Sequence, residues 1–233
     1  MIDFHSHILP GMDDGSQKVE ESLQMLAAQA KQGIDTVVAT SHFYADRSSP
    51  RRFVEKRSRA WEALREELPQ NTPEILLGAE VLYFPGISRA KGMGLLCTEG
   101  TNILLLEMPF IRWPETMVRE VRDLAHSGRY TLMMAHIERY YFLQDQSVWD
   151  ELNDDGIWMQ SNAEFFLSFR TKRKALKLLW EDRIHLLGTD CHNMDKRRPR
   201  MDEAMAVIRK RLGDELVSEI DARGRKLLKE AAV

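Results

Sequence analysis

Two histidines close to the N-terminus, His5 and His7, are separated by a single residue. In an extended strand alternate side chains leave the backbone on the same face, so both imidazoles would point the same way. Two imidazoles placed like this can hold one metal ion, although a pair of half-exposed histidines near a terminus explains them equally well. Asp13 and Asp14 follow after a turn at Pro10-Gly11. A carboxylate near the histidine pair favours the metal-binding interpretation.

More histidines and acids occur where other predicted strands end. In parallel β/α folds the carboxyl ends of the strands and the loops that follow them build the active site. The residues at these predicted ends, with Asp14 from the first loop, are His5, His7, Asp14, His42, Glu80, Glu107, His136, Asp190 and His192. One such residue is more often a hydrogen-bonded core group than a ligand, but chance explains nine on one edge poorly. We interpret His126, near a helix end, and His185, at the opposite end of a strand, as structural.

The elements that must position these residues follow from hydrophobic periodicity. Seven short apolar or β-branched runs alternate with amphipathic helical stretches, which is typical of a parallel sheet covered by helices. The predicted strands are 2–7, 36–42, 74–82, 102–108, 131–136, 157–162 and 184–190. Ser16 and Gly33 are the expected ends of the first helix, and Ser49-Pro50 is the expected start of the second. We predict an α/β fold in one domain, residues 1–233.

Composition limits the classes of function. The chain has 233 residues and 43% hydrophobic content, enough for a substantial core. A net charge of -3 with interspersed acids and bases indicates neither nucleic acid nor a membrane surface as partner. No signal-peptide pattern or membrane-spanning run is visible, and two cysteines form no disulfide framework, so we expect a cytoplasmic protein without membrane insertion.

The number and type of candidate ligands indicate more than one metal ion. Five imidazoles and four carboxylates are too many for one tetrahedral zinc, and nitrogen with oxygen ligands suits manganese, iron or zinc in a multinuclear site. With two dications the four carboxylates leave about zero net charge, and with three they leave about two positive charges. Surplus positive charge would attract an anion such as phosphate, and three ligands per metal would leave positions open for water or substrate.

The order of these residues resembles a known superfamily. His5-x-His7, His42, Glu80, Glu107, His136 and Asp190-x-His192 are similar to the metal motifs of the polymerase-and-histidinol-phosphatase (PHP) superfamily. Five segments resemble more closely the bacterial PHP-type protein-tyrosine phosphatases of capsular and exopolysaccharide gene clusters. They are FHSHILPGMDDG at 4–15, TSH at 40–42, GAE at 78–80, AHIERY at 135–140 and TDCHN at 189–193. The resemblance covers nearly the whole chain.

The resemblance implies a distorted (β/α)7 TIM-like barrel, the PHP fold, with three divalent metal ions, often manganese, with iron or zinc as alternatives. By analogy the first metal would be held by His5, His7, Glu80 and Asp190, the second by Glu80, Glu107 and His136, and the third by Asp14, His42 and His192. Glu80 would bridge two of them. The choice of Asp14 over Asp13 comes from the family, because spacing alone does not separate them.

The same resemblance assigns phosphate binding to Arg139 and Arg197. A guanidinium near the metals can chelate two phosphoryl oxygens and stabilise their developing charge. Arg198 and Arg200 could take the place of Arg197, because RRPR stands where the family usually has one arginine followed by prolines.

Cys191 with Arg197 six positions later matches the bare signature of thiol-dependent tyrosine phosphatases. That chemistry needs a tight loop of backbone N–H groups around phosphate, whereas this loop contains Asp195 and bulky side chains, and the usual Ser or Thr after the arginine is missing. A thiol mechanism also leaves the other histidines unexplained. We therefore interpret Cys191 as a small residue between two metal ligands.

The expected function is a metal-dependent phosphomonoesterase that hydrolyses protein phosphotyrosine with a metal-activated hydroxide. The resemblance implies, as its substrate, the tyrosine-rich tail of a bacterial tyrosine kinase that controls polysaccharide export. The alternatives are a small-molecule phosphatase of the same superfamily, for instance for histidinol phosphate, the Cys191-dependent phosphatase, and a non-catalytic regulator that binds phosphotyrosine. The residues identify neither a general acid nor an oligomeric state.

Overall fold

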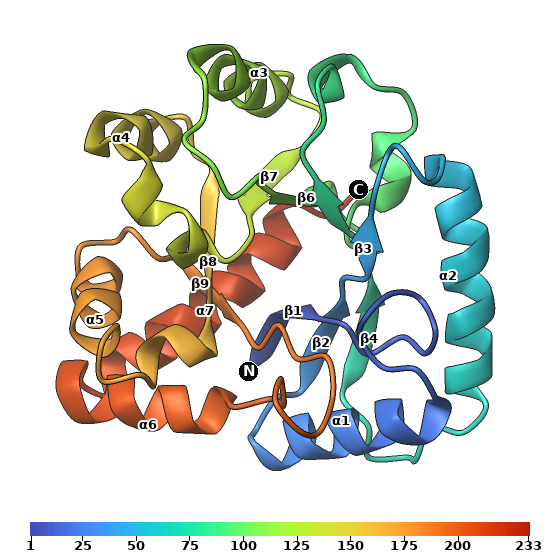
Figure 1. Ribbon diagram of the computed structural model, residues 1–233. Coiled ribbons are helices and arrows are strands. Elements are labelled where there is room, and N and C mark those ends of the chain that lie inside the picture. Colours follow the sequence, from blue (N-terminus) through green and yellow to red (C-terminus); the bar gives the residue numbers. More distant parts are fainter.

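The strands lie parallel near the middle of the molecule and helices surround them, as Figure 1 shows for the computed structural model, which describes all 233 residues. The strands are β1 (Ile2–Ser6), β2 (Thr36–Ala39), β3 (His42–Phe43), β4 (Glu74–Leu77), β5 (Glu80–Leu82), β6 (Ile103–Glu107), β7 (Thr131–Met134), β8 (Trp158–Asn162) and β9 (Leu186–Gly188). The α-helices are α1 (Val19–Lys31), α2 (Pro50–Arg65), α3 (Glu115–Ala125), α4 (Gln146–Asp154), α5 (Lys172–Trp180), α6 (Met201–Leu212) and α7 (Asp214–Glu230). The α/β class predicted from periodicity is confirmed.

Nine strands occur instead of seven because two of the predicted strands are each interrupted by two residues. β2 ends before Thr40 and β4 ends before Gly78, so the strands form a sheet β1-β2-β4 and a sheet β3-β5-β6-β7-β8-β9. The pairing register is the same on both sides of the interruption, with Ala39 opposite Leu77 and His42 opposite Glu80. The two sheets therefore follow one another as a single curled surface.

The first and last strands meet and bring the two ends of this surface together. Ser6 forms a parallel bridge with Cys191, the Asp190 N–H donates to the His5 carbonyl (2.7 Å), and the His7 N–H donates to the Cys191 carbonyl (2.9 Å). The buried Asp3 carboxylate also accepts hydrogen bonds from the backbone N–H and hydroxyl of Thr189, at 2.8 and 2.6 Å. β1 therefore lies beside β9 and the residues that follow it.

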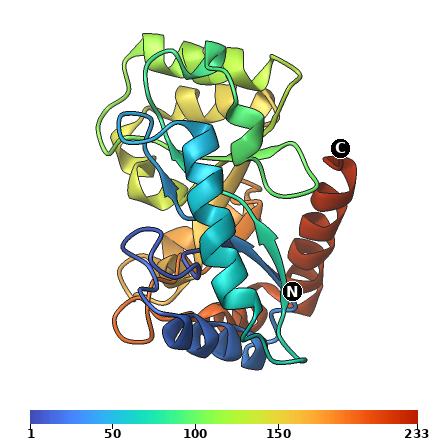
Figure 2. The ribbon, with the colours of Figure 1, turned by 90° about the vertical axis from the view of Figure 1, so that its right-hand side faces the viewer.

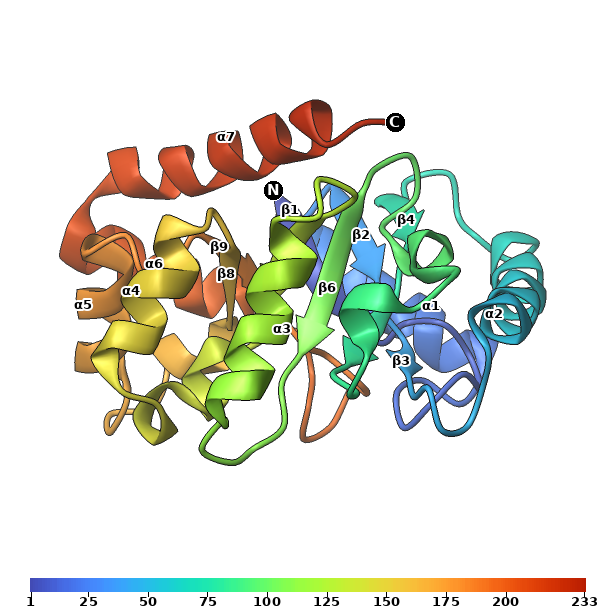
Figure 3. The same ribbon diagram turned by 90° about the horizontal axis from the view of Figure 1, so that it is seen from above.

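Alternate residues of the strands belong to two different cores. On β6, Leu104 and Leu106 pack into the large core under the surrounding helices, whereas Ile103 and Leu105 belong to a smaller cluster with Leu227 of α7. Figure 3 shows α7 lying across the end from which the β6 arrow starts, and Figure 2 shows it along the right-hand edge of the molecule. α7 therefore closes the amino-terminal end of the curled sheet and leaves the carboxyl end to the loops.

The helix ends differ in part from the predictions. Ser49 accepts a hydrogen bond from the Arg52 N–H and begins α2 as expected. The prediction for Ser16 was wrong: α1 begins at Val19, and the Ser16 hydroxyl contacts Ser22 Oγ (2.8 Å) instead of capping the helix. None of the helices is both long and apolar enough to cross a bilayer.

Candidate metal centre

Glu80, the first residue of β5, is surrounded by four imidazoles. Its Oε2 lies 3.2 Å from His5 Nε2, 3.3 Å from His7 Nε2 and 2.9 Å from His42 Nδ1, and its Oε1 lies 2.7 Å from His136 Nε2. Glu80 is almost fully buried. Burial raises the pKa of its carboxyl, but His5 and the hydrogen bonds to the imidazoles outweigh this effect and hold the pKa well below its usual range.

His5 and His7 share one face of β1, as the strand periodicity predicts, and both are buried. Their Nε2 atoms are 3.1 Å apart, and each lies 3.5–3.6 Å from Asp190 Oδ1 beyond the end of β9. Burial disfavours an imidazolium, yet the hydrogen bond of His7 to Asp13 and the nearby Glu80 carboxylate raise the pKa of His7 to about 10. Without a cation here, a proton must compensate the carboxylates.

Glu107 is the last residue of β6 and lies near two of the imidazoles that surround Glu80. Its carboxylate oxygens lie 3.5 Å from His136 Nε2 and 3.9 Å from His42 Nδ1. Burial and the adjacent Glu80 charge raise the pKa of the Glu107 carboxyl to about 7. A divalent cation between these residues would remove this repulsion and favour two ionised carboxylates.

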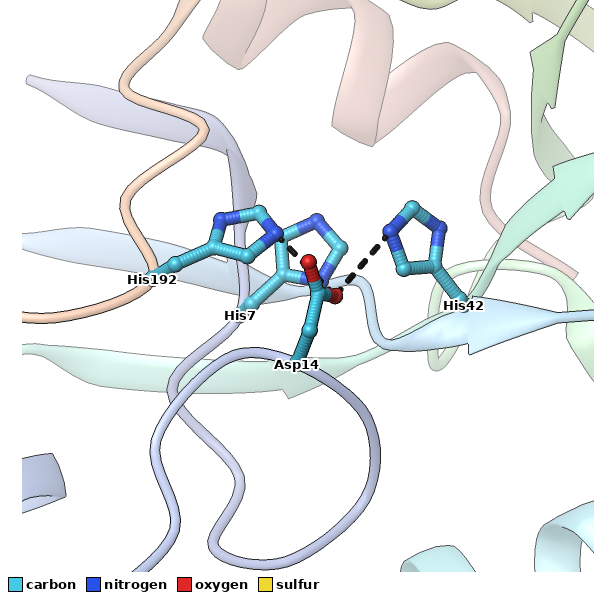
Figure 4. Close-up of side chains that lie close together, drawn as sticks. All are labelled: His7, Asp14, His42 and His192. Atoms are coloured by element: carbon cyan, nitrogen blue, oxygen red, sulfur yellow. Dashed lines mark ion pairs between the residues drawn. The ribbon is translucent and has the colours of Figure 1, made fainter. Parts of the chain in front are cut away.

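A third group lies toward the open side of the centre and is drawn in Figure 4. Asp14 Oδ1 is 3.4 Å from His42 Nε2 and 3.5 Å from His192 Nε2, and the His192 ring stacks on His7 with centroids 3.8 Å apart. Burial and the neighbouring His7 lower the pKa of His192 to about 4, which favours the neutral form that can bind a metal.

These residues fit divalent cations, because several of their buried atoms have no hydrogen-bond partner. His42 Nδ1, Glu80 Oε2 and His192 Nε2 are buried and unpaired, although each faces other ligand-type atoms at close range. Unpaired buried polar atoms are costly, and a cation would satisfy them together. Four sets of atoms lie close enough to share an ion: His5/His7/Asp190, His5/Glu80/His136, His42/Glu80/Glu107 and His7/Asp14/His42/His192. Together they contain all nine predicted metal residues.

The structure separates the two aspartates that spacing left open. Asp14 is 64% exposed and points its carboxylate at His42 and His192. Asp13 instead accepts from His7 Nδ1 at 2.9 Å and from the backbone N–H groups of Gly15 and His42. Gly15 is necessary for this turn, because an added Cβ would lie 2.4 Å from the His7 carbonyl oxygen. Asp13 therefore orients His7 so that its Nε2 faces the cluster.

Gln160 and Asn162 on β8 also support the centre, and sequence reasoning did not identify them as site residues. Gln160 Oε1 contacts His5 Nδ1 (3.3 Å) and accepts from the His136 N–H (2.7 Å), while its amide donates to Asn162 Oδ1. Asn162 Nδ2 donates to Asp190 Oδ2 at 2.8 Å. The only available signal was the alternation of polar residues within a buried strand.

Backbone strain is concentrated at two of the candidate ligands. His136 has φ 30° and Asp190 has φ 51°, both in the left-handed region. Neither residue is a glycine, so each conformation costs on the order of 1–3 kcal/mol. Each lies two residues beyond the end of its strand, β7 for His136 and β9 for Asp190, and has its side chain in the cluster.

Both predicted phosphate-binding arginines lie at the edge of the cluster. Arg139 donates to Asp190 Oδ2 and has its other terminal nitrogen 3.7 Å from Glu107. Arg197 lies 2.9 Å from Asp190 Oδ2 and 3.6 Å from Asp14. Each is more than one-third exposed, so the guanidinium groups reach both the cluster and solvent.

The two alternatives to Arg197 point elsewhere. Arg198 pairs with Glu203, and Arg200 pairs with Glu164 and Glu203. The RRPR segment therefore brings a single guanidinium to the cluster.

Cys191 is fully buried, and burial raises the pKa of its thiol well above the usual value. The loop around it is already hydrogen-bonded, since the His192 N–H donates to the Arg197 carbonyl and the Arg197 N–H donates to Asn193 Oδ1. The raised pKa therefore disfavours a thiolate at Cys191, and the hydrogen bonds of the loop occupy N–H groups that a thiol-dependent phosphatase would use to bind phosphate.

Two hollows border the centre. One, of about 430 Å³, contains Asp190, Arg139, Arg197 and Asn162 together with Phe165. The other, of about 680 Å³, contains Asp14 and His42 and extends along α2. Tyr44 lines the second hollow and stacks on His42, with ring centroids 5.4 Å apart.

Known proteins are similar to this chain in sequence and in fold. A family model described as capsular polysaccharide synthesis, CpsB/CapC, matches residues 1–228. The tyrosine-protein phosphatase CpsB of Streptococcus pneumoniae is 30% identical over 94% of the chain and 94% of its own length. The tyrosine-protein phosphatase YwqE of Bacillus subtilis is 28% identical over 100% of the chain and 93% of its own length.

The three-dimensional comparison agrees with the sequence comparison. A crystal structure described in work on YwqE from Bacillus subtilis and CpsB from Streptococcus pneumoniae as metal-dependent tyrosine phosphatases superposes with a TM-score of 0.83 at 26% identity. The superposition covers 100% of this chain and 96% of that chain. The similarity therefore extends over the whole α/β fold rather than one motif.

Proposed function

This chain belongs to the CpsB/CapC family of capsular polysaccharide synthesis, and from that premise we propose that it is a metal-dependent phosphomonoesterase acting on protein phosphotyrosine. The observation that carries the proposal is the convergence of five imidazoles and four carboxylates, with Glu80 as the carboxylate nearest to four of the imidazoles. The relatives named tyrosine-protein phosphatases support the choice of substrate. The whole of residues 1–233 would act as one domain, a distorted seven-unit barrel in which β2/β3 and β4/β5 each count as one strand.

Three divalent ions, with manganese as the leading candidate and iron or zinc as alternatives, would occupy the cluster. The proposed ligands are His5, His7, Glu80 and Asp190 for the first, Glu80, Glu107 and His136 for the second, and Asp14, His42 and His192 for the third. The unpaired atoms of Glu80, His42 and His192 support this assignment. When bound, the metals would supply positive charge for phosphoryl oxygens and a water of lowered pKa as nucleophile.

The side chains of this protein would position the phosphate. Arg139 and Arg197 both lie against Asp190 and can turn their outer N–H groups to phosphoryl oxygens at the edge of the cluster. Their fixed charges would stabilise negative charge that develops on these oxygens. Tyrosinate, with a pKa of about 10, leaves more easily than a serine alkoxide, so a strong general acid is less essential.

The proposed physiological substrate is the phosphotyrosine-containing tail of a bacterial tyrosine kinase. Support comes from the family, whose description is capsular polysaccharide synthesis, and from the sequence resemblance. The open rim of the centre agrees with a protein substrate, because Arg139, Arg197 and Asp14 are all accessible.

The test is phosphate release from a phosphotyrosyl peptide, with a phosphoseryl peptide of otherwise identical sequence as control. Activity should disappear after chelation, return with manganese, and prefer phosphotyrosine. Cys191→Ser should retain activity, because the buried thiol has no role in the proposed reaction. Activity that survives chelation but is lost in Cys191→Ser would overturn the metal-dependent proposal.

A further inference from the structure

The hollow along α2 has an unusual set of charges. Besides Asp14 and His42 it contains Arg47, Arg52, Lys56 and Arg59. Its only carboxylates are Asp13, which is engaged by His7, and Asp14 of the metal cluster. The surface that continues outward from the candidate metals is therefore strongly basic, in a chain whose net charge is -3.

The cations on α2 form one stripe. Arg52, Lys56 and Arg59 are spaced i, i+4 and i+7, so they lie on the same helix face over about 10 Å. In Figure 1 this helix runs along the right-hand side, beside the dark-blue loop between β1 and α1. The Lys56 ammonium donates to the Met12 carbonyl at 2.6 Å and so ties the stripe to that loop.

The arginines of the hollow have no acidic partner. Neither Arg52 nor Arg59 forms an ion pair, and both are exposed. Arg47 lies over the Tyr44 ring, 4.6 Å from its centroid, rather than against a carboxylate. By contrast, Arg198 and Arg200 on the other side of the centre are paired with glutamates. Arg47, Arg52 and Arg59 therefore have side-chain charges that are free to bind an external anion.

We propose that this hollow binds acidic side chains next to the phosphotyrosine of a polypeptide substrate. The inference rests on the proposed function and adds a basis for substrate choice. An extended chain rises about 3.3 Å per residue, so about three residues span the stripe. With a phosphotyrosine at the metals, two flanking Asp or Glu residues about three positions apart would thus lie opposite Arg52 and Arg59. Charge complementarity over this length selects an acidic segment as occupant.

The test compares three phosphotyrosyl peptides that differ only in the residues on both sides of the tyrosine. These flanking residues are acidic (Asp or Glu) in the first peptide, the corresponding amides (Asn or Gln) in the second, and lysine in the third. The wild-type protein should favour the acidic peptide over the amide peptide about tenfold in kcat/KM, through KM, and this preference should weaken at high salt. In Arg52→Gln/Arg59→Gln the preference should fall to about twofold with kcat unchanged. Turnover of free O-phosphotyrosine should stay the same.

The matched control is Arg51→Gln/Arg65→Gln, which removes the same charge from exposed positions of α2 outside the hollow. It should keep the preference for the acidic peptide. Equal turnover of the three peptides by the wild-type protein would overturn the proposal, and so would an equal loss in both double variants.

A binding measurement separates this proposal from the proposed function. Fluorescence anisotropy of the unphosphorylated acidic peptide, measured on chelated protein, needs no turnover and no metal. The dissociation constant should rise about tenfold in Arg52→Gln/Arg59→Gln and stay unchanged in the control. Failure to hydrolyse any phosphotyrosyl compound would refute the phosphatase proposal alone, whereas unchanged binding in the variant would refute the acidic-peptide site alone.

Discussion

At the scale of single residues, Glu80 determines how the candidate centre is arranged. Its two oxygens face His5, His7 and His42 on one side and His136 on the other. A carboxylate with this many imidazole neighbours suits a bridge between cations better than a single hydrogen-bonded pair. The residues around it act as a unit, so single substitutions should give effects that do not add.

Asp13 and Asp14 should respond differently to the same substitution. Asp13→Asn weakens the hold on His7 Nδ1, so metal affinity should fall about 10- to 100-fold while saturating manganese restores activity. Asp14→Asn removes a proposed ligand and should stay impaired at saturation. Activity titrated against free manganese measures both. Asp46→Asn, an exposed change nearby, is the control, and identical curves for the two aspartate variants would contradict these roles.

Arg197 and Arg198 offer a second residue-level contrast. Arg197→Gln should lower kcat/KM for a phosphotyrosyl peptide by about 10²–10³, because it removes a guanidinium from the proposed phosphoryl position beside Asp14 and Asp190. Arg198→Gln should change it less than twofold, since Arg198 pairs with Glu203 at the surface. Steady-state kinetics decides, and equal losses would show that Arg197 has no special place.

Residue types and their spacing were sufficient to select eight of the nine candidate ligands, because strand ends on one edge must converge, and the resemblance supplied Asp14 as the ninth. The sequence could not distinguish Asp13 from Asp14, since a two-residue turn can point either side chain inward. It also could not show that Arg197 alone of the three nearby arginines reaches the cluster. That outcome depends on Glu164 and Glu203 binding Arg200 and on Glu203 binding Arg198.

At the scale of elements, the interruptions in β2/β3 and β4/β5 serve the site. Periodicity predicted two continuous strands, and their outer bounds are nearly correct. The interruptions depend on contacts between strands: the Glu80 N–H donates to the carbonyls of Thr40 and Ser41, and Thr40 Oγ1 contacts the Ser6 backbone. No local pattern encodes such contacts, so the division of each strand could not be predicted.

The helix that closes the amino-terminal end depends on a glycine. An added Cβ at Gly224 of α7 would lie 2.7 Å from the Phe4 ring, which is buried on β1. Gly224→Ala should therefore lower the free energy of unfolding by about 1–3 kcal/mol, measured by urea denaturation.

Two further variants test this explanation. Gly224→Ala combined with Phe4→Leu should be less destabilised than the sum of the two single changes, because the smaller side chain relieves the contact. Lys229→Ala, an exposed change on the same helix, should have little effect. Strict additivity of the two buried changes would contradict the steric account.

At the scale of the whole molecule, metal binding should stabilise the fold, because the candidate ligands come from strands all around the curled sheet. A ligand at 100 times its dissociation constant contributes about 2.7 kcal/mol, which corresponds to roughly 5–10 °C in Tm for a chain of this size. Adding manganese to chelated protein should raise Tm by this amount. Differential scanning fluorimetry measures the shift.

Glu80→Gln should abolish most of this shift, because it removes the carboxylate shared by the candidate sites. His126→Ala provides the control, since His126 is exposed and pairs with Asp155 away from the cluster. A shift of equal size in both variants would place the stabilising ions elsewhere.

The contact between β1 and β9 has a consequence for the synthesis of the protein on the ribosome. His5 and His7 are translated before Asp190 and His192, which emerge 185 and 187 residues after His5. At a translation rate of about 5–20 residues per second, roughly 10–40 s pass between the synthesis of His5 and that of His192. During that interval β1 is an open edge and the metal centre is incomplete. The nine candidate ligands can therefore be brought together only after His192 has been translated.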